Sequence, residues 1–384
     1  MTEVQGKSEI QGQCAGQFEA VRSALEANLA SGEELGASVW MNVAGETVID
    51  MWGGHRDAAR TVPWDEHTIT NVWSTTKTIT SLAALMLVDR GLLDPYEKVA
   101  AYWPEFAENG KDQIEVRHLM GHTSGVSGWD APFAVEDMYD RDRSTARLAA
   151  QAPWWEPGTA SGYHAQNQGH LVGEVVRRVS GKPLTQFVAE EIAGPLGADF
   201  HIGLPESEFG RVSNVIPPPP LPMDLSLLDP EMIVVKTFTG PAPDASVAWT
   251  TEWRQADIGA ANGHGNARSI AMAQRAISNG GVVGEHRLLS QDTIDQIFRV
   301  QAEGIDHVLM VPLKFGIGFG LPNETFAHLP DRRLCVWGGW GGSQVVNDLD
   351  NKMTVVYVMN RMGEGLVGDV RGQSLTNAAL AVVA

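Results

Sequence analysis

Strand-like segments stand near both ends of this chain, and helix-like segments fill the part between them. The strand-like segments are rich in β-branched and aromatic residues and occupy 36–53, 334–336, 344–347 and 352–359. A sheet must bury its apolar face against another layer, so strands and helices segregated in this way favour a sheet covered by helices. We therefore expect an α+β fold in which both ends of the chain build one antiparallel sheet, with a mostly helical part inserted.

The chain of 384 residues exceeds a typical single domain, which favours two interleaved parts. We expect a discontinuous sheet domain at 1–73 and 265–384, a helical domain at 74–264, and a cleft between them. Helices are predicted from 74 to just before Gly91, near 117–121, and at 168–179, 184–191, 267–278 and 373–383. Prolines at 217–220 and 222 exclude a regular element there and predict a stiff extended loop.

The composition indicates a soluble acidic protein. A formal net charge of -19 and a pI near 4.9 argue against nucleic acid or an anionic membrane as partner. No run of about 18 apolar residues occurs, and residues 1–17 lack the apolar core of a signal peptide. Cys14 and Cys335 form no spaced cluster, so we expect two free thiols in the reducing cytoplasm. The oligomeric state is left open.

The stretch Ser74-Thr75-Thr76-Lys77 places a hydroxyl and an amine three residues apart where an apolar helical run begins. Residues i and i+3 share a helix face, so Lys77 can reach the Ser74 hydroxyl and activate it as a nucleophile. This four-residue pattern also arises by chance. However, the following helix is apolar on nearly all sides, and a lysine buried at its start is costly unless it is paired or functional.

Tyr163 is the best candidate for a second proton-handling group. It follows a turn that contains Pro157 and Gly158 and precedes the helix predicted from 168. A phenol near a lysine ammonium has its anionic form favoured, so Tyr163 and Lys77 could together take and return the Ser74 proton. Alternatively, Tyr163 is a core or turn tyrosine with a satisfied hydroxyl.

The glycine-rich segment 337–343 (WGGWGGS) is the third candidate. Crowded glycines beside a strand usually mark a close approach of the backbone, here to a substrate carbonyl. The alternative is a glycine-rich bulge with packed tryptophans. Twelve tryptophans occur in the chain, and several lie close to these segments, which favours an apolar, aromatic pocket. The proline-containing segment 204–250 is expected to form part of the cleft wall.

Together these three segments resemble the motifs of the serine β-lactamase and penicillin-binding protein superfamily, in the form found in family VIII carboxylesterases. Further stretches that resemble this family are 119–125 (LMGHTSG), 181–184 (GKPL) and 192–197 (IAGPLG). The resemblance implies a β-lactamase-like fold, an acyl-enzyme on Ser74, and Lys77 with Tyr163 as the base pair. It also implies an oxyanion hole formed by the backbone N–H groups of Ser74 and Trp340.

Two departures from the class C β-lactamase pattern indicate which kind of superfamily member this chain resembles. Tyr163-His164-Ala165 replaces Tyr-x-Asn, and Trp337 replaces the lysine that begins the third motif. Without that cation the site should prefer neutral acyl groups over carboxylates. Together with the absence of a signal sequence, this favours a cytoplasmic serine carboxylesterase acting on small or short-chain esters. The alternatives are β-lactam or amide hydrolysis, acyl transfer, and a non-catalytic penicillin-recognising protein.

We expect the ester substrate to contact Trp337, Gly338, Gly339, Trp155 and His164. No metal or other cofactor is predicted. The histidines at 118 and 122 are spaced i, i+4, but the glutamate of H-E-x-x-H is missing. No serine lies in a Gly-x-Ser-x-Gly nucleophile elbow, so the α/β-hydrolase route lacks its nucleophile.

Overall fold

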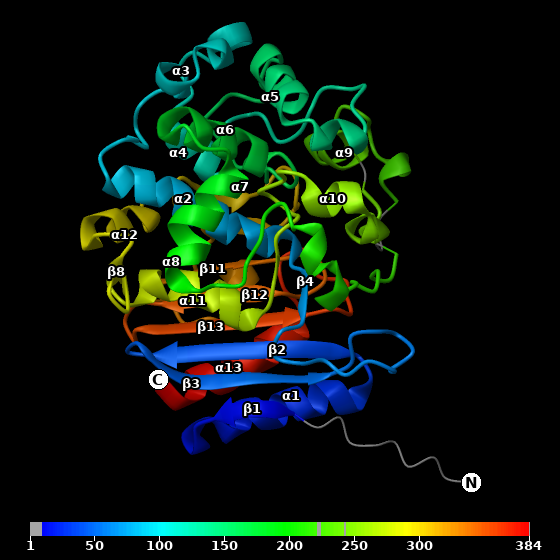
Figure 1. Cartoon of the computed structure of the whole chain (residues 1–384). Helices are drawn as coiled ribbons and strands as arrows, with labels where there is room; N and C mark the ends of the chain where they lie inside the picture. Colours follow the sequence, from blue (N-terminus) through cyan, green and yellow to red (C-terminus); the bar gives the residue numbers. More distant parts are fainter. Residues whose placement is uncertain (1–9, 221–223, 242, 384) are drawn as a thin grey trace.

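The computed structural model describes residues 10–220, 224–241 and 243–383, and its centre is an antiparallel sheet (Figure 1). The sheet has six strands in the order β1-β3-β2-β13-β12-β11. These strands are β1 (Gln11–Cys14), β2 (Gly36–Val43), β3 (Glu46–Gly54), β11 (Leu334–Gly338), β12 (Gln344–Asp348) and β13 (Met353–Met359). Both ends of the chain therefore contribute to one sheet, which confirms the predicted α+β architecture.

The pairing of β2 with β13 joins the two ends of the chain, with Met41 opposite Val355. Strands β2 and β3 form the predicted hairpin, whose turn residues Ala44 and Gly45 have φ angles of 51° and 88°. Positive φ at both turn residues suits the right-handed twist of the flanking strands. The hairpin thus needs a glycine, or a residue that tolerates a left-handed backbone, at its tip.

Smaller pairings surround this sheet. Strand β4 (Ile69–Asn71), which leads to Ser74, lies between β5 (Val212–Ser213) and β6 (His264–Gly265). The other pairs are β7 (Val282–Val283) with β8 (His286–Arg287), and β9 (Ala302–Ile305) with β10 (Pro312–Phe315). The sequence analysis did not predict these strands, because each is too short to show the alternation of apolar and polar residues that marks a strand.

The helices confirm most of the predicted positions. They are α1 (Glu19–Ser31), α2 (Thr76–Asp89), α3 (Val99–Tyr102), α4 (Val116–Met120), α5 (Arg141–Ala150), α6 (Gln168–Ser180), α7 (Leu184–Phe187), α8 (Gly194–Leu196), α9 (Ile233–Thr239), α10 (Thr251–Gln255), α11 (Ala267–Ser278), α12 (Gln291–Ile297) and α13 (Val370–Val383). The sequence analysis did not predict α1, α3, α5, α8, α9, α10 or α12. Among the predicted helices, α2 begins at Thr76 rather than at 74, and two others differ as well. The helix expected at 184–191 becomes a π-helical turn after Phe187, and the closing helix begins at Val370 rather than at 373.

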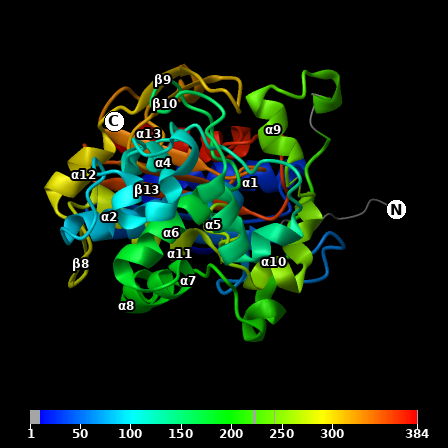
Figure 2. The ribbon, with the colours of Figure 1, turned by 90° about the horizontal axis from the view of Figure 1, so that it is seen from above.

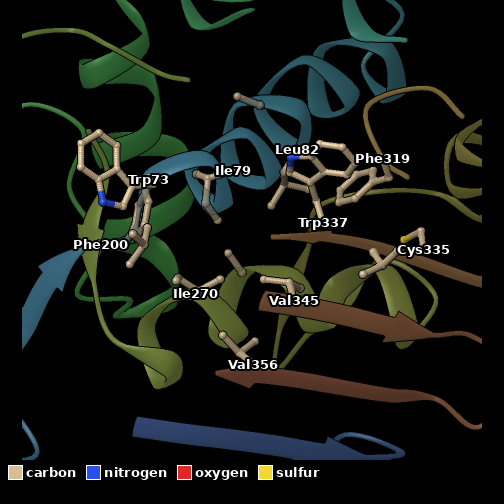
Figure 3. Close-up of a cluster of buried hydrophobic side chains, with 14 of the residues drawn as sticks. Trp73, Ile79, Leu82, Phe200, Ile270, Phe319, Cys335, Trp337, Val345 and Val356 are labelled. Atoms are coloured by element: carbon tan, nitrogen blue, oxygen red, sulfur yellow. The ribbon is translucent and has the colours of Figure 1, made fainter. Parts of the chain in front are cut away.

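Helices cover both faces of the sheet. In Figure 1, α1 lies below the sheet, and α11 and α2 lie above it; α13 packs against α1, and α6 packs over α2. Viewed from above (Figure 2), α5, α6 and α7 lie over the middle of the molecule. The core between these layers is apolar: Val345 and Val356 of the sheet, Ile270 of α11, and Ile79 and Leu82 of α2 are all buried (Figure 3).

Residues 217–220 form no helix or strand, as the prolines predicted. Pro222 and residues 1–9 of the polar N-terminal stretch lie outside the described residues. Cys14 and Cys335 are both free thiols, as predicted.

Candidate active site

Ser74 lies in a sharp connection between a strand and a buried helix. The chain leaves β4, makes a 3-10 turn at Trp73–Thr75 and enters α2. Trp73 has a φ of +48°, a left-handed conformation that costs a non-glycine residue roughly 1–3 kcal/mol and often marks functional sites. The α-helix therefore begins two residues later than expected, and the turn presents the Ser74 side chain to a cavity.

Lys77 lies in the first turn of α2, and its side chain is buried. Its Nζ is 3.0 Å from Ser74 Oγ, 2.7 Å from the Ala165 carbonyl oxygen and 2.9 Å from the Ala260 carbonyl oxygen. Burial lowers the pKa of Lys77 well below its usual value. A neutral amine donates its two hydrogens to the two carbonyls and directs its lone pair at the Ser74 hydroxyl. The structure thus brings the two residues of the first motif together with a base facing the nucleophile.

Tyr163 also lines the cavity beside Ser74. The expectation that Lys77 favours the phenolate is wrong. Burial raises the pKa of Tyr163 well above its usual value, although hydrogen bonds with Ser74 and Trp337 lower it in part. Lys77 Nζ lies 4.8 Å from the centre of the Tyr163 ring, but burial lowers the pKa of Lys77 and so disfavours the charged form that would stabilise an anion there. The phenol therefore holds its proton in the resting site.

Two residues that the sequence analysis did not assign to the site fix the backbone at Tyr163. The carbonyl oxygen of His122 accepts the Gly162 N–H at 2.9 Å, and His122 Nδ1 accepts the His164 N–H at 3.1 Å. Between them, Oδ1 of the buried Asp306 accepts the Tyr163 N–H at 3.0 Å. Three consecutive backbone donors are thus bound. His122 lies in a stretch noted for its family resemblance, whereas no local signal marks Asp306.

His164 and Trp155 do not line the cavity as the sequence analysis expected. His164 is fully buried, and its ring nitrogens hydrogen-bond Ser124 Oγ at 2.6 Å and the Gly162 carbonyl oxygen at 2.7 Å. The Trp155 indole N–H donates to the Ala160 carbonyl oxygen at 3.0 Å. Both side chains therefore support the turn that carries Tyr163, and neither contacts the space where a substrate would bind.

Trp337, Gly338 and Gly339 also differ from their expected placement. The Trp337 side chain is buried beside Leu82 and Phe319 (Figure 3), and its indole N–H donates to the Tyr163 hydroxyl. A Cβ at Gly338 would lie 2.7 Å from the Gly368 nitrogen, and one at Gly339 would lie 2.4 Å from the Val72 carbonyl oxygen. These glycines are needed because other segments of the chain approach them closely.

The peptide that joins Gly339 to Trp340 is oriented by hydrogen bonds to its carbonyl oxygen. That oxygen accepts the N–H groups of Gly342 at 3.1 Å and Gly368 at 3.4 Å. In a planar trans peptide the N–H points opposite to the C=O, so the Trp340 N–H faces away from these partners. Among residues 10–220, 224–241 and 243–383, no acceptor is found for the N–H of Trp340 or of Ser74. Both are thus available to a developing oxyanion.

The cavity beside Ser74 has a volume of about 370 Å³ and mostly apolar walls. Trp73 packs against Trp253 with ring centres 5.5 Å apart and against Trp340 at 5.0 Å. The lining residues are Trp73, Ser74, Tyr163, Ala165, Gln166, Leu225, Phe238, Pro243, Asp244, Trp253, Ala261, Leu309, Trp340 and Leu366. Four of these belong to the segment 204–250, which confirms its predicted place in the cleft wall. Asp244 is the one charged side chain among the described residues that line it.

A comparison with known protein families decides the identity of the fold. The family model described as Beta-lactamase matches residues 21–379. The chain belongs to the beta-lactamase family. This membership confirms the predicted superfamily and the β-lactamase-like fold. Among the described residues, no helix has the length and apolarity needed to span a membrane.

Individual relatives of this beta-lactamase family member include esterases. An esterase/beta-lactamase, LipL of Mycobacterium tuberculosis, is 33% identical over 347 residues, which cover 86% of this chain and 78% of that protein. The crystal structure of a family VIII carboxylesterase has a TM-score of 0.91 and 40% identity, with 97% of this chain and 100% of that chain covered. A penicillin-binding protein homologue from Caulobacter crescentus has a TM-score of 0.90 and 36% identity, with 98% and 100% covered.

Proposed function

We propose that this protein is a serine carboxylesterase that hydrolyses small or short-chain neutral esters through an acyl-enzyme on Ser74. The observation that carries this proposal is the 3.0 Å contact between Lys77 Nζ and Ser74 Oγ at the wall of an apolar cavity. The similar proteins described as esterases support the same chemistry, and the predicted enzyme class, a serine hydrolase, is confirmed.

Acylation begins when the neutral Lys77 amine takes the Ser74 proton as Oγ attacks the ester carbonyl carbon. The N–H groups of Ser74 and Trp340 stabilise the oxyanion that forms. The bond to the alcohol oxygen then breaks, and Tyr163 gives its proton to the departing alkoxide. The proton held on Lys77 restores the Tyr163 phenol.

Deacylation repeats these steps with water in place of the alcohol. A water molecule loses a proton to the base pair as its oxygen attacks the acyl carbon, and the bond to Ser74 Oγ breaks. Ser74 regains a proton, and the carboxylic acid leaves. The raised pKa of Tyr163 suits this assignment, because a phenol that keeps its proton at neutral pH can act as the general acid.

The cavity walls support a preference for neutral substrates. Trp337 stands in the sequence where class C β-lactamases have a lysine, and Asp244 at the cavity wall repels carboxylates. Residues from both predicted parts of the chain, 1–73 with 265–384 and 74–264, line the cavity, which supports an active site between these two domains. The free thiols of Cys14 and Cys335 support a reducing compartment such as the cytoplasm.

The test is hydrolysis of p-nitrophenyl acetate, butyrate and octanoate beside a chromogenic cephalosporin, with wild type compared with Ser74→Ala. Adducts are followed by intact mass. We expect ester turnover that disappears in Ser74→Ala, a transient acyl adduct, and little cephalosporin cleavage. Undiminished ester turnover in Ser74→Ala would remove Ser74 as the nucleophile. A wild-type adduct that forms without turnover would favour the penicillin-recognising protein instead.

A further inference from the structure

The loop at 361–369 supports the segment that carries the Trp340 N–H. Gly341, the residue after Trp340, donates its N–H to the Gly365 carbonyl oxygen at 2.8 Å and accepts the Gly363 N–H at 2.8 Å. Gly341 has a φ of +91°, a conformation that favours glycine. A segment of several glycines has little conformational preference of its own, so these external contacts must hold its shape.

Arg371, at the start of α13, connects the glycine segment around Gly341 and the loop at 361–369 to the protein interior. Its side chain is 7% exposed, and one guanidinium nitrogen, Nη2, donates to the Gly341 carbonyl oxygen at 2.8 Å. The other, Nη1, donates to the Arg361 carbonyl oxygen at 2.9 Å. Nε donates to Asp369 Oδ2 at 2.8 Å, and Nη1 also lies 3.3 Å from Oε1 of the buried Glu34. The planar guanidinium of Arg371 thus connects the 339–343 segment, the loop at 361–369 and two carboxyl groups.

We propose that Arg371 is a positioning residue for catalysis, which holds the Gly341 carbonyl so that the preceding Trp340 N–H stays directed at the oxyanion. This inference rests on the proposed function, because it assigns Trp340 to the oxyanion hole. Arg371 does not line the cavity, so its effect reaches the substrate through the backbone at 340 and 341.

Loss of the Arg371 contacts should weaken binding of the transition state but not binding of the substrate. The oxyanion forms only after attack, so a displaced Trp340 N–H should lower kcat and leave KM nearly unchanged. Arg371→Lys is the main variant, because it keeps the positive charge beside Asp369 and Glu34 but loses the planar fork that reaches several acceptors at once. Arg361→Lys is the matched control. Arg361 lies in the adjoining loop at 361–369, and its side chain donates to the Gly32 carbonyl oxygen rather than to the 339–343 segment.

The measurements are kcat and KM for p-nitrophenyl butyrate and the inhibition constant of n-butylboronic acid, whose serine adduct is a tetrahedral anion. In Arg371→Lys we expect kcat to fall roughly ten- to a hundredfold, in line with displaced oxyanion donors, with KM within about threefold. The boronic acid should bind more weakly by a similar factor. Arg361→Lys should match wild type in all three quantities.

Asp369→Asn is a second variant for the case in which Arg371→Lys does not fold. Asp369 accepts the Arg371 guanidinium at Oδ2 and the backbone N–H groups of Arg371 and Gly372 at Oδ1. In either orientation an Asn amide would place its NH2 against one of these sets of donors, so Arg371 should shift, and the same fall in kcat and boronic acid affinity is expected. Wild-type kcat and boronic acid affinity in a folded variant of either kind would overturn the proposal. If Ser74→Ala retained ester turnover, the proposed function would fail instead. That result is distinct, since it does not involve the Arg371 variants.

Discussion

The indole N–H of Trp337 donates a hydrogen bond to the phenolic oxygen of Tyr163 across 3.1 Å. Trp337, which stands where class C β-lactamases have the lysine of the third motif, thus acts on the proton-handling tyrosine. A donor at this oxygen stabilises the tyrosinate, which is the form left after Tyr163 has protonated the leaving alkoxide. The bond therefore lowers the pKa of Tyr163 from the still higher value that burial alone would give.

Trp337→Phe should slow the release of poor leaving groups selectively. The substitution keeps an aromatic ring but removes the N–H, and a lost hydrogen bond of about 1 kcal/mol corresponds to a roughly fivefold lower kcat. Ethyl butyrate should show this loss because its alkoxide needs a proton. p-Nitrophenyl butyrate should be affected less, since p-nitrophenolate leaves without one. An equal loss for both esters would contradict the role assigned to the bond.

The pH profile of kcat/KM should reflect the lowered pKa of Lys77. Burial favours the neutral amine, so the base is present at neutral pH, and activity should fall as acid protonates it. Lys77→Arg, which stays protonated, should lose activity at every pH. Measuring hydrolysis of p-nitrophenyl acetate from pH 5 to 10 tests this. Activity that develops only near pH 10, where an ordinary lysine loses its proton, would contradict it.

Asp306 should matter for both activity and stability through its acceptor oxygen. Oδ1 accepts the N–H groups of Tyr163 at 3.0 Å, Val308 at 2.9 Å and Leu309 at 2.9 Å. Asp306→Ala leaves these donors without a partner, at about 1–3 kcal/mol for each one that stays buried, and frees the Tyr163 backbone. We expect a lower Tm and a roughly tenfold or greater loss of kcat. Asp306→Asn keeps an acceptor oxygen and should retain most of both, and an equally damaged Asn variant would count against this reason.

The local spacing of the sequence was sufficient to predict part of this site. Ser74 and Lys77 are three residues apart, so helix geometry alone brings them together. Asp306 lies 143 residues from Tyr163, whose N–H it accepts, and Arg371 lies 30 residues from Gly341. Such contacts depend on how the chain folds back on itself, and a single polar residue in a loop carries no periodic signal.

Local signals in the sequence predicted the central strands and helices α2, α6, α11 and α13, but not α1 or α5. The hairpin 36–53 and the helix 267–278 have strong period and turn signals, and both appear in the structure at nearly these bounds. The role of Trp337 was harder to predict. A tryptophan beside glycines can line a cavity or pack in a core, and only the positions of its neighbours on α2 and β10 distinguish the two.

Glu34 should make the protein less stable as the pH rises through neutrality. Burial raises the pKa of Glu34 from 4.5 to about 7, although Arg371 and a hydrogen bond from Tyr357 oppose the shift. The folded state therefore binds a proton that the unfolded state releases between about pH 4.5 and 7, and the unfolding free energy falls across that window by up to roughly 3 kcal/mol. Urea unfolding at pH 5 and pH 8 measures this. The decrease should be smaller in Glu34→Gln, and an identical decrease in both proteins would exclude Glu34 as its source.

Asp244 should govern the discrimination against anionic esters. Its side chain lines the cavity and accepts the Ser246 N–H at 2.8 Å, which starts the turn at Ala245–Trp249. Asp244→Asn preserves this cap but removes the negative charge, so kcat/KM for a p-nitrophenyl hemisuccinate should rise relative to p-nitrophenyl butyrate. Because Asp244 is exposed, the gain should be only about two- to fivefold at low salt and should vanish at 1 M salt, where charges are screened within about 3 Å. A gain that persists at high salt would point to a change in cavity shape rather than in charge.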